Sequence, residues 1–477
     1  MFQCTRLRLA KLALAVPALV IPIFAAIFFF LLAPAPRAQE QSHVDFIRSL
    51  AAAIDETALT PRERLGLPLF FDANLSDPAG LACASCHDPR RAFTGNNSTM
   101  IGVAQGSRSD QFGTRDAPTV MYLATAPRFS RNGSIQTDGK RVPAGGHFWD
   151  GRADTLEEQA RQPLFNAAEM NNADTPALIA KVARSAYADA FRKEWGDTVF
   201  DHPEAALDAV AASIAAFERT RVFQPFTSKF DYVMRGEAKF TEQEQRGLSF
   251  FTIRQKGNCA QCHTVDVASR DPQKSLFTDF SYRALGLPRS MRIPKNADPA
   301  FIDLGLCERV PVSGAKPGTQ TAKPGTQTAK PTATDIKPPV TDPAACGLFK
   351  TPTLRNITIT APYMHNGFFD TLRDAVAFYA TRDTDPVRWF SEGKKFNDLP
   401  IQYHANVDVD TPPYQRRPQQ RPQLTDTEVD DIVAFLYTLT DGYKIDPSRS
   451  GKKPQSEITP PRSPVASPVP PAARGEY

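Results

Sequence analysis

Two short stretches decide the fold: Cys83-Ala-Ser-Cys86-His87 and Cys259-Ala-Gln-Cys262-His263. Each has the Cys-x-x-Cys-His spacing by which c-type haem is attached. The chemistry requires this spacing, because two thiols on one turn can form thioethers with the two vinyl groups while the adjacent imidazole reaches the iron. A four-cysteine zinc site or a redox dithiol is the alternative, but neither needs a histidine directly after the second cysteine in both copies. The sequence therefore predicts two covalently bound haems.

The segments that lead into the two motifs are copies of one another. Residues 60–71 read T-P-R-E-R-L-G-L-P-L-F-F, and residues 241–251 read T-E-Q-E-Q-R-G-L-S-F-F. Both contain a Thr-x-x-Glu capping box followed by Gly-Leu and aromatic residues, which predicts the start of a helix. This internal duplication predicts two similar helical domains. Apolar residues at helical spacing predict further helices over Pro203–Arg221 and Leu424–Leu439.

Composition limits the kind of partner. The chain has 477 residues, of which 41% are hydrophobic and 23% charged, as expected for globular domains with real cores. The formal net charge is only +4, so the broad basic surface that nucleic-acid binding needs is not expected. We therefore expect no nucleic-acid partner.

The amino terminus reads as an export signal. Arg6, Arg8 and Lys11 precede an uncharged, mostly apolar run over 12–32, and Ala33-Pro-Ala-Pro-Arg-Ala38 follows. The run is also long enough to span a bilayer, so residues 1–38 are either a signal peptide cleaved near Ala38 or a retained inner-membrane anchor. Both alternatives place the rest of the chain in the periplasm.

Two segments have the composition of disordered chain. The Pro-, Thr-, Lys- and Gly-rich insert at 308–345 repeats A-K-P-G-T-Q-T at 315–321 and 322–328, and the tail at 447–477 is rich in Pro and Ser. Cys307 and Cys346 bracket the insert. Because the expected compartment is oxidising, we predict a disulfide between them at the base of the loop.

The sequence resembles the bacterial di-haem cytochrome c peroxidases and, more closely, the MauG-type di-haem enzymes. Besides the two haem motifs, the resemblance rests on F-W-D-G-R at 148–152, N-A-A-E-M at 166–170, T-P-T-L-R-N at 351–356 and A-P-Y-M-H-N-G at 361–367. It covers roughly residues 59–443. It implies a mainly α fold of two cytochrome-c-like domains with one covalent c-type haem each: a peroxidatic domain at 39–222 and an electron-transfer domain at 223–446.

The resemblance also implies roles for single residues. His87 and His263 would be the proximal ligands of the two haem irons, and Trp149 would lie between the haems. Glu169 would be the carboxyl that moves a proton between the oxygens of bound peroxide, with Gln159 and Pro163 beside it in the distal pocket. Taken alone, Trp149 would more often be a core aromatic residue and Glu169 an exposed helix residue.

The sixth ligand of each haem separates the branches of the family. Ordinary di-haem peroxidases carry a capping histidine where this chain reads Ile101-Gly102-Val103, so the first haem is expected to be open without prior reductive activation. Fourteen residues after His365, where those peroxidases have a methionine ligand, this chain has Tyr379, as MauG-type enzymes do. A phenolate would stabilise the second iron against reduction. Met364 is the rival ligand.

A calcium ion is expected between the domains. The family binds it through an Asn side chain and two backbone carbonyls, and the matching positions here are Asp116, Thr360 and Pro362. An aspartate keeps the oxygen ligand and adds negative charge, which suits calcium.

Three functions follow from these expectations. The first is reduction of hydrogen peroxide with electrons from a small periplasmic cytochrome c or cupredoxin. The second is a MauG-like oxidase that modifies a tryptophan-bearing protein, although the surface tryptophan that MauG has just before its second haem motif is not matched at Gly257. The third is a non-catalytic di-haem electron carrier, which Glu169 and the missing capping histidine argue against.

Overall fold

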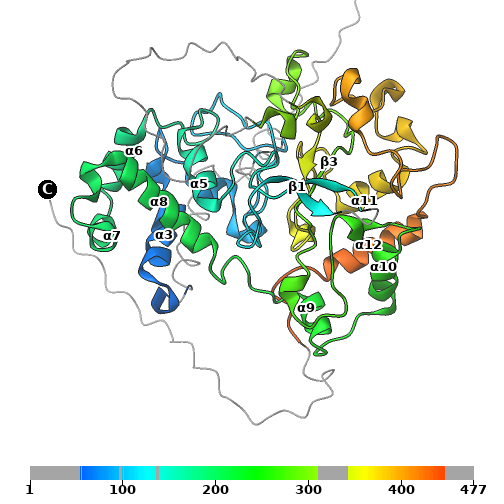
Figure 1. Ribbon diagram of the computed structural model, residues 1–477, viewed down its shortest axis with the longest axis horizontal. Helices are drawn as coiled ribbons and strands as arrows, with labels where there is room; N and C mark the ends of the chain where they lie inside the picture. The colour runs from blue at the N-terminus through cyan, green and yellow to red at the C-terminus, as the bar shows by residue number, and fades with distance from the viewer. Residues whose placement is uncertain are drawn as a thin grey trace, which may run out of the picture. The chain divides into compact units, whose positions relative to one another are not determined.

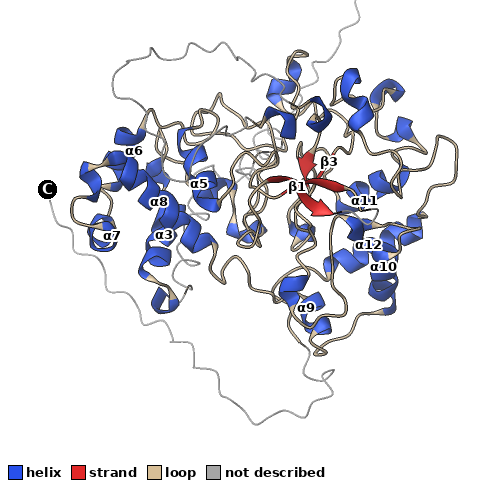
Figure 2. Cartoon of the chain, in the orientation of Figure 1, coloured by secondary structure: helices blue, strands red, loops and turns tan. Residues whose placement is uncertain are grey.

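Helices make up most of the regular structure. In the computed structural model, which describes residues 54, 56–95, 99, 101–135, 139–309 and 342–445, the α-helices gather in two groups (Figures 1 and 2). Their bounds are α3 Pro61–Phe71, α4 Cys83–Cys86, α5 Leu156–Phe165, α6 Thr175–Val182, α7 Ala188–Trp195, α8 Pro203–Glu218, α9 Lys229–Met234, α10 Glu242–Thr252, α11 Leu372–Thr381 and α12 Asp426–Tyr437. The mainly α prediction is confirmed.

Several predictions concern residues outside this range. The signal or anchor at 1–38, the tail at 447–477 and the greater part of the insert at 308–345 lie outside the described residues. The described residues from Glu56 onward belong to one compact unit. Within the described part of the chain, every helix is too short or too polar to cross a membrane.

The duplicated segments form matching helices. In α3, the Thr60 hydroxyl accepts a hydrogen bond from the Glu63 N–H at 3.4 Å, and the Glu63 carboxylate accepts one from the Thr60 N–H at 2.7 Å. In α10, Thr241 and Glu244 form the same reciprocal pair at 3.2 and 2.7 Å. Both helices have 11 residues. The two predicted capping boxes are therefore confirmed.

A glycine lets each of these helices cross a second helix closely. Helix α3 packs on α8, and α10 packs on α12. A Cβ atom on Gly66 would lie 2.1 Å from the Ser213 carbonyl oxygen, and one on Gly247 would lie 1.9 Å from the Asp431 carbonyl oxygen. Only a residue without a side chain fits either crossing. The duplication in sequence is thus a duplication of helix packing.

The two predicted long helices form with small shifts at their ends. Helix α8 begins at Pro203 as predicted but ends at Glu218, because the chain then turns and the Phe223 N–H donates to the Thr220 carbonyl at 3.1 Å. Helix α12 begins after its N-cap Thr425 and ends at Tyr437.

The sheet content is small and lies between the two groups of helices. Strands β1 (Ser130–Ile135) and β2 (Arg141–Ala144) are antiparallel, with Ile135 opposite Arg141. Strands β3 (Tyr282–Arg283) and β4 (Phe349–Lys350) are antiparallel, with Tyr282 opposite Lys350. A bridge between Ala144 and Ser281 joins the pairs, which appear in red in Figure 2.

The predicted disulfide is present. Cys307 and Cys346 are bonded, with their Cα atoms 4.7 Å apart. The flanking backbone is paired as well, because the Leu306 N–H donates to the Leu348 carbonyl at 2.9 Å and the Gly347 N–H to the Leu304 carbonyl at 2.8 Å. The disulfide therefore closes the base of the insert, as expected from the sequence.

Candidate functional site

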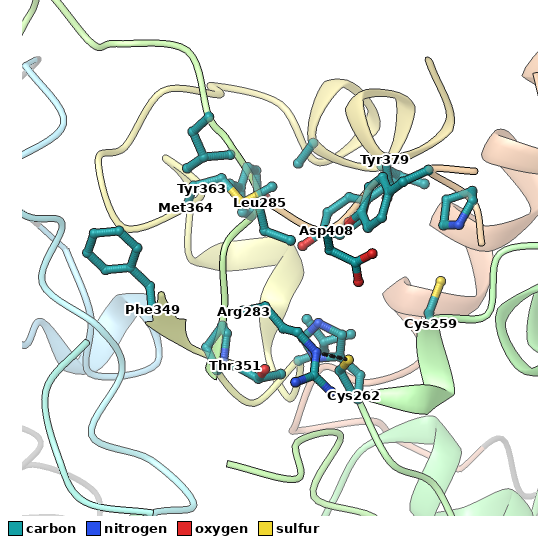
Figure 3. Close-up of a pocket in the computed structure, with 18 of the residues that line it drawn as sticks. Cys259, Cys262, Arg283, Leu285, Phe349, Thr351, Tyr363, Met364, Tyr379 and Asp408 are labelled. Atoms are coloured by element: carbon teal, nitrogen blue, oxygen red, sulfur yellow. Dashed lines mark hydrogen bonds between the residues drawn. The ribbon is translucent and has the colours of Figure 1, made fainter. Parts of the chain in front are cut away.

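The second Cys-x-x-Cys-His motif opens on a largely apolar pocket. Cys259, Cys262 and His263 line it together with Tyr379 of α11, and Figure 3 shows Tyr379 across the pocket from Cys262. The apolar walls come from α10, α11, α12 and the segment at 285–287, with these residues among them: Phe251, Leu285, Leu287, Leu372, Val376, Ile432 and Leu436. The pocket thus combines two thiols, an imidazole and a phenol with an apolar lining.

Both motif histidines are oriented in the same way. The Nδ1–H of His87 donates to the Phe93 carbonyl at 3.1 Å, and the Nδ1–H of His263 donates to the Phe277 carbonyl at 2.9 Å. Burial lowers the pKa of each imidazole, more than the backbone carbonyls raise it. Each ring is therefore neutral and keeps its Nε2 lone pair for a metal.

The four motif cysteines suit thioether formation. None of them is in a disulfide, and each is half-buried. Burial raises the pKa of Cys83, Cys86 and Cys259 to about 12 and raises that of Cys262 as well. Two free thiols beside a neutral imidazole with an available Nε2 are the donor set that a c-type haem requires, so the residues of both motifs fit the group.

Glu169 lies beside the first motif. Its Oε2 is buried and has no hydrogen-bond partner within the described part of the chain. Burial raises the pKa of this carboxyl, although the nearby charge of Arg152 acts to lower it. The charge of Glu169 in turn helps burial to raise the pKa of Cys86. The structure thus brings a buried carboxyl with a raised pKa to the first motif.

Gln159 and Pro163 lie one turn apart on α5, the helix that precedes Glu169. The chain then turns, with the Glu169 N–H donating to the Asn166 carbonyl at 2.9 Å and the Ser107 N–H donating to the Glu169 carbonyl at 2.8 Å. These backbone bonds fix the position of Glu169 relative to α5.

The segment without a capping histidine is packed tightly. Gly102 has a positive φ of 83°, and a Cβ there would lie 3.0 Å from the Gly367 carbonyl oxygen. Val103 is fully buried. The Ile-Gly-Val segment therefore lies with its backbone against the His-Asn-Gly segment at 365–367.

Trp149 contacts residues from both halves of the chain. Its Nε1–H donates to the Asp116 carbonyl at 2.8 Å, and its own carbonyl accepts from the Lys350 N–H at 2.8 Å. Its ring centroid lies 6.3 Å from that of His365, and it lines the pocket of the second motif. Trp149 therefore contacts both the segment at Asp116 and the wall of the second pocket.

Tyr379 and its rival Met364 both line the second pocket. Figure 3 shows the two side chains on different segments, Tyr379 on α11 and Met364 on the loop before it. Burial raises the pKa of the Tyr379 phenol, and its ring lies 5.8 Å from that of Tyr414. The structure therefore supplies both candidate ligands.

The predicted calcium residues come from two segments that meet. The Asp116 N–H donates to the His365 carbonyl at 2.7 Å, three residues after Pro362. The Arg91 guanidinium donates to the carbonyl of Ala361, between Thr360 and Pro362. In the described ranges, no three His, Cys, Asp or Glu side chains converge as a metal site.

Two buried ionisable residues were missed in the sequence. Lys350 donates from Nζ to the Gly146 carbonyl at 2.8 Å, and burial lowers its pKa to about 8. Glu218 is buried at the end of α8, and burial raises its pKa to about 8. A charged residue that ends a strongly apolar helical run was the one available signal for Glu218.

Comparison with known proteins gives one consistent family. A model of the di-haem cytochrome c peroxidase family matches residues 60–239. The methylamine utilization protein MauG of Paracoccus denitrificans is 36% identical over 385 residues, which cover 79% of this chain and 88% of that protein. The cytochrome c551 peroxidase of Nitrosomonas europaea is 30% identical over 325 residues, or 67% and 74% of the two chains.

Solved structures agree. The diheme peroxidase BthA of Burkholderia thailandensis superimposes with a TM-score of 0.70 at 40% identity, over 82% of this chain and 89% of that one. A MauG-like protein associated with microbial copper homeostasis gives a TM-score of 0.52 at 26% identity, over 80% and 90% of the two chains.

Proposed function

Because the chain belongs to the family of di-haem cytochrome c peroxidases and MauG proteins, we propose that it is a periplasmic enzyme that reduces hydrogen peroxide with electrons from a small cytochrome c or cupredoxin. The family establishes an oxidoreductase and implies two haems. The observation that carries the choice of reaction is the buried, unpartnered Oε2 of Glu169 beside the first motif. A plain electron carrier has no use for such a carboxyl.

Six residues would hold the two haems. Cys83 and Cys86 would form the thioethers of the first haem and Cys259 and Cys262 those of the second, with His87 and His263 as proximal ligands. The haems supply iron that binds peroxide and exchanges electrons. The backbone carbonyls of Phe93 and Phe277 keep each imidazole in the tautomer that presents Nε2.

Glu169 would handle the proton. A carboxyl with a raised pKa can hold a proton near neutral pH and give it to the outer oxygen of peroxide, which leaves as water. Gln159 and Pro163 would line the same pocket from α5. The Ile101-Gly102-Val103 segment offers no side chain that could block the pocket as a ligand.

Trp149 and Tyr379 would serve the second haem. The contacts of Trp149 with Asp116 on one side and with Lys350 on the other support a position between the two sites. Tyr379 would be the sixth ligand of the second iron, in preference to Met364, because it lies close enough to Cys259 and Cys262 for both to raise the pKa of its phenol. A calcium ion held by Asp116, Thr360 and Pro362 would stabilise the region between the sites.

A MauG-like oxidase that modifies tryptophan in a partner protein is the second candidate. Tyr379 in the pocket and the 36% identity to MauG favour it. Gly257 argues against it, since a Cβ there would lie 2.7 Å from the Phe250 carbonyl oxygen, which leaves no room for a relay tryptophan at this point.

The first test adds stoichiometric hydrogen peroxide to the diferric holoenzyme without reductant and follows the optical spectrum by stopped flow. We expect a fast reaction in the wild type and a loss on the order of 10²-fold or more in Glu169→Gln. Glu204→Gln, at an exposed position on α8, is the matched control. A wild type that reacts only after one haem is pre-reduced would contradict the open first haem.

A further inference from the structure

Glu218 is a buried carboxyl without a partner. It is the last residue of α8 and is only 4% exposed. Its Oε2 is shielded from solvent and has no hydrogen-bond partner among the described residues. Its neighbour Arg219 is instead bound to Glu157 at 2.7 Å. A carboxyl buried in this way is costly unless something in the assembled protein uses it.

The duplicated helix packing locates this carboxyl. A Cβ on Gly66 would lie 2.6 Å from the Cβ of Phe217, and one on Gly247 would lie 2.8 Å from the Cβ of Phe435. Phe217 in α8 and Phe435 in α12 are therefore equivalent. The next residue is Glu218 in the first copy and Leu436 in the second.

Leu436 is part of the wall of the second pocket, together with Cys259, Cys262 and His263. Glu218 consequently occupies the equivalent wall position at the first motif. Glu218 also lies close to that motif. After burial, the charge of Glu218 is the largest influence that raises the pKa of Cys83. The chain thus has a carboxyl near the first motif at the position equivalent to a leucine in the wall of the second pocket.

We propose that Glu218 is a second proton-donating carboxyl at the first motif, acting in addition to Glu169; this rests on the proposed peroxidase function. Reduction of one hydrogen peroxide to two waters breaks the O–O bond and forms two new O–H bonds. It consumes two electrons, which the redox partner supplies, and two protons, which must come from solvent. Glu169 redistributes protons on the peroxide, and Glu218 brings protons from solvent to the pocket.

The charges that act on Glu218 come from the end of α8 and the first turn of α5. The ion pair of Arg219 and Glu157 is at the surface, with 39% of each side chain exposed. These two residues are also the charged groups of the described chain that act on Glu218, Arg219 favouring its charged form and Glu157 opposing it. No charged side chain of α3 or α6 in the described range is among them. Glu218 is thus coupled electrostatically both to the partly exposed carboxylate of Glu157 and to Cys83 of the first motif.

The test compares Glu218→Gln, which keeps the shape but holds no acidic proton, with Glu218→Leu, which reproduces the wall of the second pocket. Glu204→Gln on the exposed face of α8 is the control. Three quantities are measured on the holoenzymes: steady-state peroxide reduction from pH 5 to 9, its solvent deuterium isotope effect, and haem content.

We expect both Glu218 variants to keep two haems and to lose turnover by about tenfold to 10²-fold, with a changed pH profile and a larger isotope effect. Turnover, pH profile and isotope effect equal to wild type in Glu218→Gln would overturn the proposal. If Glu218→Leu loses haem, the pair Glu218→Gln and Glu218→Asp decides, because only the aspartate can restore turnover through a proton.

The Glu169→Gln variant separates this proposal from the function on which it rests. Loss of the peroxide reaction in Glu169→Gln, with wild-type behaviour in Glu218→Gln, would reject the role of Glu218 and leave the peroxidase intact. Wild-type peroxide reduction in both variants would reject the peroxidase mechanism itself.

Discussion

The indole N–H of Trp149 donates a hydrogen bond of 2.8 Å to the backbone carbonyl of Asp116. The same residue receives the Lys350 N–H at its carbonyl, so one tryptophan is held from both halves of the chain. These contacts hold Trp149 in place whether or not its ring links the two sites. The proposed link can therefore be tested by substitution.

In Trp149→Phe we expect the lost hydrogen bond to cost only about 1 kcal/mol of stability. If Trp149 links the two sites, peroxide added to the diferric variant will change the spectrum of the first haem and leave that of the second unchanged. Stopped-flow spectra combined with haem content measure this. Trp195→Phe is the control, because Trp195 donates to Ser213 within the first group of helices. Equal responses of both haems in Trp149→Phe would contradict the link.

The two crossing glycines predict matched losses. Gly66→Ala and Gly247→Ala each place a Cβ within 2.1 Å or less of a backbone carbonyl oxygen. We expect each to destabilise the protein by about 1–3 kcal/mol or more, since the helices must separate. Guanidinium unfolding measures this, with Gly113→Ala as control, where the nearest atoms are 3.6 Å away. Unchanged midpoints in the first two variants would rule out the crossing geometry.

Removal of the disulfide should lower the free energy of unfolding without affecting the first motif. Replacing both Cys307 and Cys346 by Ser opens a loop whose ends are 39 residues apart. We expect a loss of about 2–4 kcal/mol in unfolding free energy. The same loss should follow from a reductant acting on the wild type, and the double variant should no longer respond to it. If a reductant still destabilises the double variant, its effect must come from another group.

Glu218 predicts a pH dependence of stability. Burial raises its pKa from 4.5 to about 8, so between these values the folded protein holds a proton that the unfolded chain has released. The contribution of Glu218 to stability is therefore full below pH 4.5 and is lost as the pH rises to about 8. Between pH 5 and 8 we expect the wild type to lose stability relative to Glu218→Gln by on the order of a few kcal/mol. Parallel pH curves for the two proteins would be the contrary result.

Arg355 and Asp231 form an ion pair of 2.9 Å in which neither side chain is exposed. Arg355 also donates to the carbonyl of Ser275 at 3.0 Å, two residues before the Phe277 carbonyl that orients His263. We expect Arg355→Met to cost about 3–5 kcal/mol, because it leaves a buried carboxylate unpaired. Adding Asp231→Asn should recover part of that loss. Thermal unfolding of the single and double variants measures both effects, and a further loss in the double variant would refute the pairing argument.

Local patterns in the sequence were enough for much of the fold. The capping boxes at Thr60 and Thr241 and the helix α12 depend on contacts within a few residues, so they can be read directly from the chain. The Cys307–Cys346 bond could be predicted because only these two cysteines lie outside both residues 1–38 and the Cys-x-x-Cys-His motifs. Each Cys-x-x-Cys-His motif is contiguous, as the proposed haem attachment would require, because that chemistry needs the residues on one turn.

Other features required the tertiary structure. Glu218 looks like an ordinary charged residue at a helix end, and only the crossing of α3 and α8 shows that it is buried at the wall equivalent to Leu436. Lys350 likewise reads as an ordinary lysine in a short strand. Only the structure shows that its Nζ donates a hydrogen bond to the Gly146 carbonyl. Burial and desolvation depend on segments far apart in the chain, whereas capping and attachment motifs depend on neighbours. The sequence by itself therefore determined the chemistry at the two motifs, and the packing decided which further carboxyl and ammonium groups were taken out of water beside them.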